Sequence, residues 1–150
     1  MISFQFRRAS TLAVLAAVLT SGCGMMMDNR KNEVPFTTQL RSSNEVPAVV
    51  SGGSGQVDAV LNKNTNLLRW KLSYSGLSGP ATAGHFHGPA AVGANAGVAV
   101  PFAGSMTSPM EGSATLTAAQ AADLMAGRWY ANIHTAANPG GEIRGQMTAR

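Results

Sequence analysis

Three histidines are the residues of this 150-residue chain whose spacing suggests chemistry. Two of them, His85 and His87, flank Phe86 in the stretch GHFHG at 84–88, and the third is His134. If this stretch is a strand, its side chains alternate between faces, so the two histidines share one face about 6.6 Å apart while Phe86 points into the core. Imidazole nitrogen is a good ligand for Zn and Cu, so the pair is a candidate chelate.

A predicted C-terminal hairpin positions His134. Apolar and polar residues alternate over 129–134 and again over 141–148, with Asn-Pro-Gly at 138–140 between them. A five-residue loop over 136–140 closes the hairpin. The register then pairs Ile133 with Ile143 and Trp129 with Met147 on the apolar face. On the other face it pairs His134 with Glu142, Asn132 with Arg144, and Tyr130 with Gln146.

This polar face allows two interpretations. In the first, the three histidines bind Zn or Cu, and Glu142 is the fourth ligand or the partner that orients His134. In the second, the histidines hydrogen-bond to neighbouring backbone, and Glu142 pairs with Arg144 or an imidazole to hold two sheet segments together. The sequence leaves both open.

The other polar residues of the same face are a second candidate site. They are either an extension of the site towards a ligand or an ordinary polar outer face of a sheet. These residues are Tyr130, Asn132, Arg144 and Gln146. No nucleophile with an adjacent base and no phosphate-binding loop can be recognised, so no catalytic residue is predicted.

The rest of the exported part predicts short strands. Residues 34–41 alternate as a half-buried strand, and further strands are expected around 84–88, 98–102 and 114–116. A hairpin with a two-residue turn at 64–65 pairs three apolar positions on one face and a charged pair on the other. These pairs are Leu61 with Leu68, Ala59 with Trp70, Val57 with Leu72, and Asp58 with Lys71.

One short helix, about 117–126, is expected between these strands and the last hairpin. Thr117 is a suitable N-cap with Gln120 three residues later, and Gly127 suits the C-terminal left-handed position. Trp70 and Trp129 are predicted core residues. Frequent turns and the absence of a βαβ rhythm indicate an all-β fold, an antiparallel β-sandwich or barrel of about seven to eight strands with this single helix.

The N-terminus predicts export. Arg7 and Arg8 precede an apolar run over 9–19, which is too short to span a bilayer, so residues 1–22 are interpreted as a signal peptide. The stretch LTSGC at 19–23 resembles the lipobox of bacterial lipoproteins, which implies that Cys23 is lipidated and anchors the protein in a membrane. Residues 23–33 are then a lipid-anchored flexible tether. Ordinary cleavage and secretion of a soluble protein is the alternative.

Charge and cysteine content exclude two classes of protein. The net charge is +4, but removal of residues 1–22 leaves nine basic and seven acidic side chains without a basic cluster, so no nucleic-acid partner is expected. Cys23 is the only cysteine, so the domain cannot contain an internal disulfide.

Three motifs resemble the chordin-type (CHRD) domain family in order and spacing over about residues 34–148. They are NEVPA at 44–48, GHFHGP at 84–89, and GRWYANIHT at 127–135 continuing to PGGEIRGQ at 139–146. In the first motif, Glu45 is expected to cap backbone donors at a strand-end turn. The His-x-His tripeptide is also similar to the metal-binding pair of copper/zinc superoxide dismutases.

The family resemblance implies an all-β extracytoplasmic domain without an established enzymatic activity. It favours a non-enzymatic module, anchored to the cell envelope through Cys23, that binds an unknown protein or small-molecule ligand. The alternative is a Cu- or Zn-binding envelope protein, with redox or metal-handling activity, that uses His85, His87 and His134.

Overall fold

Residues 31–150 are described by the structure, a computed structural model. The predicted signal peptide and Cys23 lie outside these residues. From Glu33 onward the chain forms nine strands, one 3₁₀ turn and one α-helix. No helix within residues 31–150 is long and apolar enough to cross a membrane.

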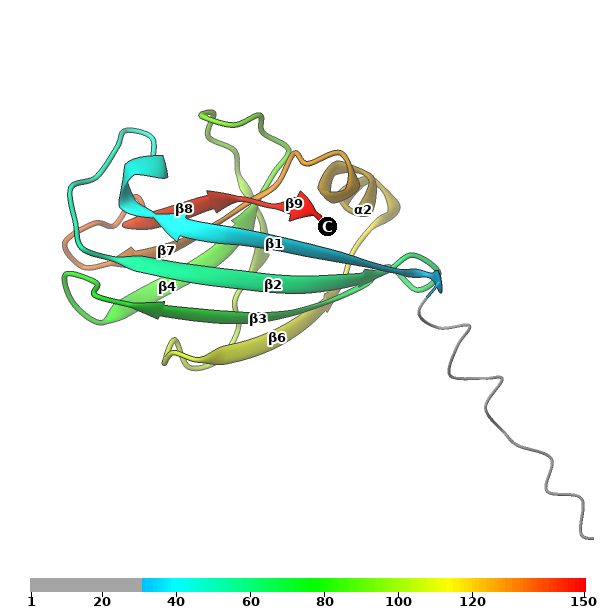
Figure 1. The fold of residues 1–150 in the computed structure, drawn as a ribbon, viewed down its shortest axis with the longest axis horizontal. Coiled ribbons are helices and arrows are strands. Elements are labelled where there is room, and N and C mark those ends of the chain that lie inside the picture. The colour runs from blue at the N-terminus through cyan, green and yellow to red at the C-terminus, as the bar shows by residue number, and fades with distance from the viewer. Residues whose placement is uncertain (1–30) are drawn as a thin grey trace, which may run out of the picture.

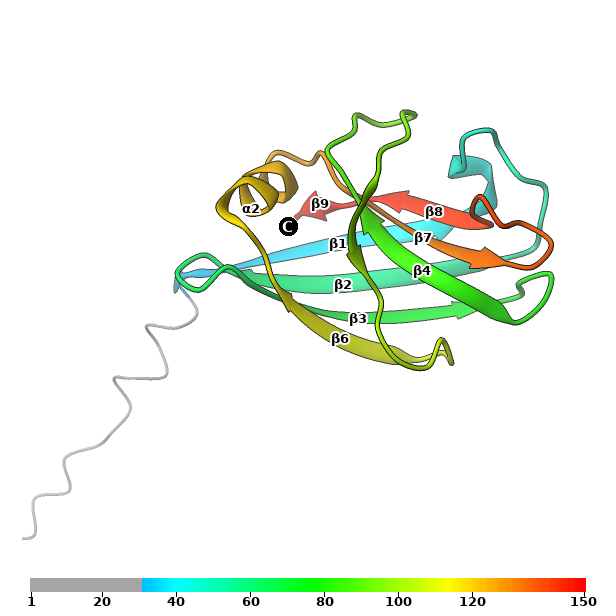
Figure 2. The same cartoon turned by 180° about the vertical axis from the view of Figure 1, so that it is seen from behind.

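The strands form one antiparallel sheet in the order β5-β4-β7-β8-β1-β2-β3-β6, with β9 beside β1. The sheet curls around the core, so that β1, β2, β3 and β6 face β4, β7 and β8 in a nearly closed barrel (Figures 1 and 2). The all-β antiparallel prediction with one short helix is therefore confirmed. The element bounds are β1 Glu33–Arg41, η1 Ser42–Asn44, β2 Ser54–Asn62, β3 Leu67–Ser75, β4 Ala81–His87, β5 Val98–Pro101, β6 Met110–Thr115, α2 Ala118–Met125, β7 Tyr130–Thr135, β8 Ile143–Gln146 and β9 Thr148–Ala149.

Both predicted hairpins have the predicted register. Strands β2 and β3 pair Leu61 with Leu68, and β7 and β8 pair Ile133 with Ile143. The agreement has a simple cause, because a one-residue slip would move every apolar side chain of a strand to the polar face.

The outer face of β2 and β3 carries the predicted charged pair, but the two residues form their ion pairs with other elements. Asp58 does lie opposite Lys71. Lys71 nevertheless pairs with Glu111 on β6 at 3.2 Å, and Asp58 pairs with Arg150 at 2.7 Å. Each charge on this exposed face therefore has its partner on a strand or terminus that the hairpin pattern did not include.

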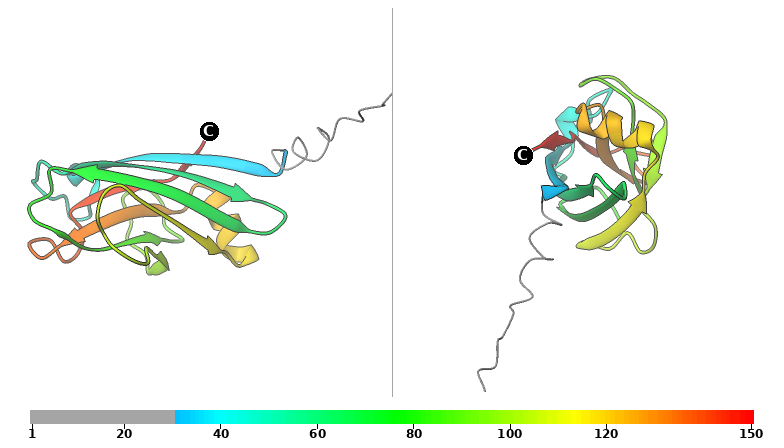
Figure 3. Two further views of the ribbon diagram at one scale, coloured as in Figure 1. Left: turned by 90° about the horizontal axis from the view of Figure 1, so that it is seen from below. Right: turned by 90° about the vertical axis from the view of Figure 1, so that its right-hand side faces the viewer.

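Helix α2 has the predicted start and end. The Thr117 hydroxyl accepts the Gln120 amide at 3.1 Å, and the Gln120 side chain accepts the Thr117 amide at 2.9 Å. Gly127 follows the helix with φ +69°, a conformation that costs glycine little. The helix covers one end of the barrel beside the start of β1 (Figure 3).

The core fills the inside of the curled sheet with aromatic rings. Trp129 and Phe86 are fully buried, and Trp70 is 5% exposed, as predicted. Phe86 meets the edge of the Trp70 ring with centroids 5.3 Å apart, and Phe102 at 4.8 Å. Because Phe86 points inward, its neighbours His85 and His87 point to the other face of β4.

Candidate metal centre

Strands β4 and β7 bring the three histidines together. These strands are antiparallel neighbours, with His85 opposite Asn132 and Ala83 opposite His134. His134 is therefore the diagonal neighbour of His85 on the same face of the sheet. The predicted grouping of His85, His87 and His134 is present in the structure.

The imidazoles are close enough to share one ion. Nδ1 of His85 lies 3.0 Å from Nε2 of His134. One ligand nitrogen from each of the three rings lies within 4.8 Å of the others, the one such group within residues 31–150. His87 and His134 are buried, whereas His85 is half-buried and faces the solvent side of the cluster.

Backbone carbonyls determine which ring nitrogens carry protons. Nδ1 of His87 lies 3.0 Å from the carbonyl oxygen of Ala96, and Nδ1 of His134 lies 2.9 Å from that of Pro139. A carbonyl only accepts hydrogen bonds, so both Nδ1 atoms carry the hydrogen, and both Nε2 atoms of the neutral rings present lone pairs. Histidine ligands of protein-bound metals are commonly oriented in this way.

Burial and mutual repulsion keep two of the rings neutral. Desolvation lowers the pKa of His85, and the neighbouring His134 and His87 lower it further. Desolvation also lowers the pKa of His134, against the opposing effect of its hydrogen bond to Pro139. Neutral imidazole is the form that binds metals, so these shifts favour ligation at neutral pH.

The structure does not support the predicted role of Glu142. Its carboxylate is fully buried, but it accepts hydrogen bonds from Ser78, Thr135 and Asn138 rather than from His134. The register prediction was sufficient to place it beside β7. Ser78, however, belongs to the β3–β4 connection, which no strand pattern could place there.

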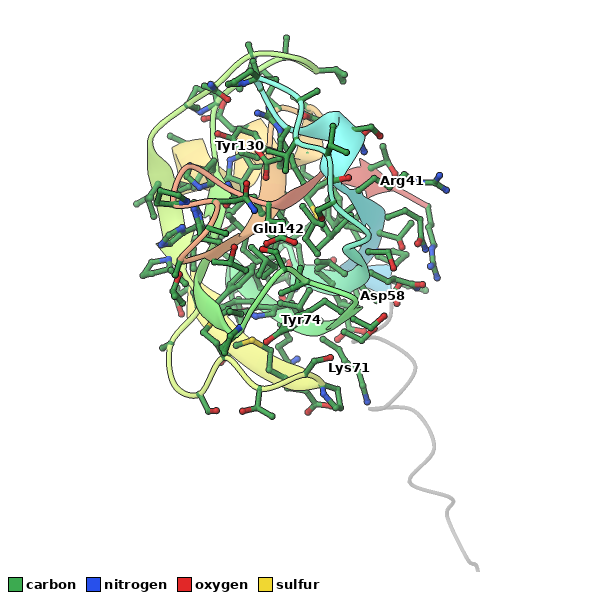
Figure 4. All side chains as sticks on the ribbon, turned by 90° about the vertical axis from the view of Figure 1, so that its left-hand side faces the viewer. Arg41, Asp58, Lys71, Tyr74, Tyr130 and Glu142 are labelled. Carbon is green, nitrogen blue, oxygen red and sulfur yellow. The ribbon has the colours of Figure 1, made fainter. Side chains whose placement is uncertain are left out.

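Figure 4 looks along the barrel from the end at which β7 and β8 are joined, with Glu142 near the middle of the view and Arg41, Asp58 and Lys71 on its right-hand side. Burial raises the pKa of Glu142, but the hydrogen bonds from Ser78 and Thr135 outweigh it and hold this pKa at about 2. Glu142 is thus an ionised clamp between the β3–β4 connection and the β7–β8 hairpin.

The predicted ligand face is mostly covered by the chain itself. Tyr130, Asn132 and Arg144 are each 3% exposed or less. Above them lies the segment 88–97, which links β4 to β5. This face is therefore neither an open ligand surface nor an ordinary solvated sheet face.

Polar contacts hold the segment 88–97 in place. Arg144 donates hydrogen bonds to Asn95 at 2.7 Å and to the Ala94 carbonyl at 2.5 Å. Its guanidinium lies 3.4 Å above the Tyr130 ring, and the same ring stacks on the His87 imidazole with centroids 4.7 Å apart. The stack fixes the plane of the His87 imidazole.

Gln146 also helps to hold the segment 88–97 over this face. Its amide donates hydrogen bonds to the carbonyls of Ala90 and Gly127 at 3.0 and 2.8 Å. Arg144 and Gln146 also line a cavity of about 330 Å³ with Glu45 and Val46, beside the covered face. This cavity is the part of the predicted ligand face that stays open.

Glu45 also lies beside this cluster, which the alternation of the strands did not indicate. Glu45 is 6% exposed, and its Oε1 has no hydrogen-bond partner within the described part of the chain. Burial raises its pKa to about 7, although the Arg144 charge, the Val46 amide and the Asn132 side chain oppose the shift. The family motif at 44–48 was the available signal, but its turn chemistry suggested only a cap of backbone donors.

The fold and the site define an all-β barrel domain with a buried polar cluster on one wall. A family model described as CHRD domain matches residues 36–147. The chain belongs to the CHRD domain family, as the three sequence motifs indicated. Neither the curated proteins nor the solved structures include a match to it.

Proposed function

We propose that this protein is an exported, non-enzymatic CHRD-domain module of the cell envelope that binds a Zn or Cu ion through His85, His87 and His134. One observation carries the proposal. Three imidazoles from two neighbouring strands present ligand nitrogens within 4.8 Å of one another. Two of the rings have their Nδ1 hydrogens bonded to carbonyls, which leaves their Nε2 atoms available to a metal.

The covered face favours a small ion over a large ligand. The segment 88–97 lies over β7 and β8, and the stack of His87 on Tyr130 fixes one ring. The half-buried His85 leaves a route from solvent to the cluster. A metal ion can enter by this route without displacing the cover.

A metal titration tests this function. The exported chain is freed of metal with a chelator and titrated with Zn(II) and Cu(II) by calorimetry, and the Cu(II) complex is examined by electron paramagnetic resonance. We expect binding of one ion per chain with nitrogen superhyperfine structure, and its loss in His87→Ala and in His134→Ala.

Thermal melts of each variant in chelator show whether the variant is still folded. Gln39→Ala changes an exposed side chain on β1 and is the control that leaves metal binding unaltered. A folded wild-type protein that takes up neither ion would refute the proposal and leave a module for another ligand.

The cell-envelope location rests on the N-terminal sequence. The charged pair Arg7 and Arg8, the apolar run over 9–19 and the lipobox-like LTSGC support export and a lipid anchor on Cys23. Secretion as a soluble protein is the alternative, and the two are distinguished by labelling of Cys23, as described in the Discussion.

A further inference from the structure

A fourth donor atom converges on the histidine cluster. The side-chain oxygen of Asn132 lies 3.0 Å from Nε2 of His87 and 3.0 Å from Nε2 of His134. We infer that Asn132 Oδ1 is the fourth ligand of the metal, which gives a site of three imidazole nitrogens and one amide oxygen. This inference rests on the proposed metal-binding function and deepens it.

The positions of the ring protons favour a cation between these atoms. The Nδ1 atoms of His87 and His134 donate to the carbonyls of Ala96 and Pro139, so both neutral rings have only a lone pair at Nε2. An amide oxygen is also an acceptor. Two nitrogen lone pairs and an oxygen lone pair that point at one another repel, whereas a metal ion between them is attracted to all three.

Glu45 orients the amide of Asn132. The Asn132 amide nitrogen lies beside the buried Glu45 carboxylate, because a Cβ added at Gly141 would be 2.7 Å from Asn132 Nδ2 and 2.5 Å from Glu45 Oε1. Of the two ends of the amide, only the NH₂ is a donor that suits a carboxylate neighbour. The amide oxygen then points the other way, towards the histidines. Glu45 is thus a positioning residue for the site, and this role gives a function to a buried carboxylate that the sequence indicated only as a turn cap.

The distances match those of a coordination shell. Four ligands at about 2.0 Å from a tetrahedral ion are about 3.3 Å apart, and ligands at right angles are about 2.8 Å apart. Three of the separations among the four donor atoms are 3.0 Å: His87 to Asn132, Asn132 to His134, and His134 to His85. The separations among the imidazole nitrogens extend to 4.8 Å, so the rings must rotate inwards to complete the shell.

The donor set also selects the ion. Three imidazoles and a neutral oxygen are borderline-to-hard ligands that suit Zn(II) and Cu(II). We therefore expect a divalent ion in the site.

The first test uses the wild-type protein. In protein carrying ¹³C and ¹⁵N in its asparagine side chains, Zn(II) is expected to shift the Asn132 amide carbonyl resonance strongly, while the Asn138 side chain, bound to Glu142, stays nearly unchanged. An unchanged Asn132 resonance in the zinc-bound protein would overturn the inference. This measurement does not depend on the folding of any variant.

The second test removes the oxygen. Asn132→Leu has a similar shape without a donor atom, and we expect its Kd for Zn(II) and Cu(II) to rise tenfold or more. The Cu(II) spectrum should keep its nitrogen superhyperfine structure but change its g values. Gln146→Leu is the matched control, because Gln146 holds the same segment 88–97 without reaching the histidines.

Glu45→Gln tests the positioning role. With a glutamine amide opposite, Asn132 can turn its oxygen away from the histidines, so we expect weaker metal binding and a mixed Cu(II) spectrum.

Wild-type affinity and an unchanged spectrum in Asn132→Leu would show that the amide is not a ligand, with the metal function intact. Failure of the wild type to bind any ion would instead overturn both proposals.

Discussion

At the scale of single residues, two buried carboxylates on one wall of the barrel behave in opposite ways. Glu45 has no partner on Oε1, and burial raises its pKa to about 7. Glu142 is also desolvated, but hydrogen bonds from Ser78 and Thr135 hold its pKa at about 2. The difference arises from the number of donors and not from burial, because both side chains are shielded from water.

The Glu142 clamp makes the fold sensitive to acid. Its pKa is about 2 in the folded chain and near 4.5 in the unfolded chain, so its contribution to stability is complete above about pH 4.5 and is lost as the pH falls towards 2. In Glu142→Gln we expect the free energy of unfolding at pH 7 to fall by about 1–3 kcal/mol, since buried donors lose their ionised acceptor.

Urea unfolding in chelator from pH 7 to pH 2 measures this effect. The variant should lose less stability than the wild type between pH 4.5 and 2. Asp123→Asn is a suitable control, because Asp123 pairs with Arg128 at the surface and not with the hairpin. Parallel pH curves for wild type and Glu142→Gln would contradict the prediction.

At the scale of elements, β8 is packed tightly against β1. The two strands share one register pair, Arg41 with Arg144, and Gly145 follows it on β8. A Cβ on Gly145 would meet the Thr38 hydroxyl and the Gln39 carbonyl at less than a normal contact distance. The absence of a side chain here allows the wall that carries the histidines to join the wall formed by β1, β2, β3 and β6.

Gly145→Ala should therefore strain this junction. Backbone atoms cannot rotate away as a side chain can, so we expect a loss of about 1–3 kcal/mol in the free energy of unfolding. Chemical denaturation measures it. Gly97→Ala is the control, because its Cβ would have no neighbour within 4 Å. Equal stability of both variants would show that the junction has room to relax.

At the scale of the whole molecule, the start of β1 and the β7–β8 turn lie at opposite ends of the barrel. β1 begins beside α2, and β7 runs from α2 towards the β7–β8 turn at the other end of the barrel (Figure 1). His134 and the Pro139 carbonyl that orients it lie near that turn. The chain therefore enters the barrel at the end away from His134.

The anchor itself is tested by lipid labelling in a bacterial host. If Cys23 is lipidated, the wild-type protein incorporates a labelled fatty acid and fractionates with membranes, whereas Cys23→Ser does neither. Ser21→Thr, a conservative change in the same segment, is the control that keeps the label. A wild-type protein without label, found in the soluble fraction, would favour secretion after ordinary cleavage.

The sequence by itself determined the local structure and which side chains share a face of each strand. Alternation predicted the β2–β3 and β7–β8 registers, and the capping residues predicted α2 at Thr117 and Gly127. Two histidines at i and i+2 necessarily share a face of a strand, so the grouping around β4 was also predictable. Apolar periodicity is a strong local signal because a shifted register would expose the core.

Only the tertiary structure decided which residues and segments contact these faces. Glu142 contacts Ser78 instead of His134, Glu45 is buried beside Asn132, and the segment 88–97 covers β7 and β8. Each of these contacts comes from a connection rich in Gly, Ala, Ser or Pro, whose sequence has no periodicity to fix its path. A buried carboxylate takes the partners that the whole fold places within hydrogen-bond distance, and alternation along one strand cannot specify them.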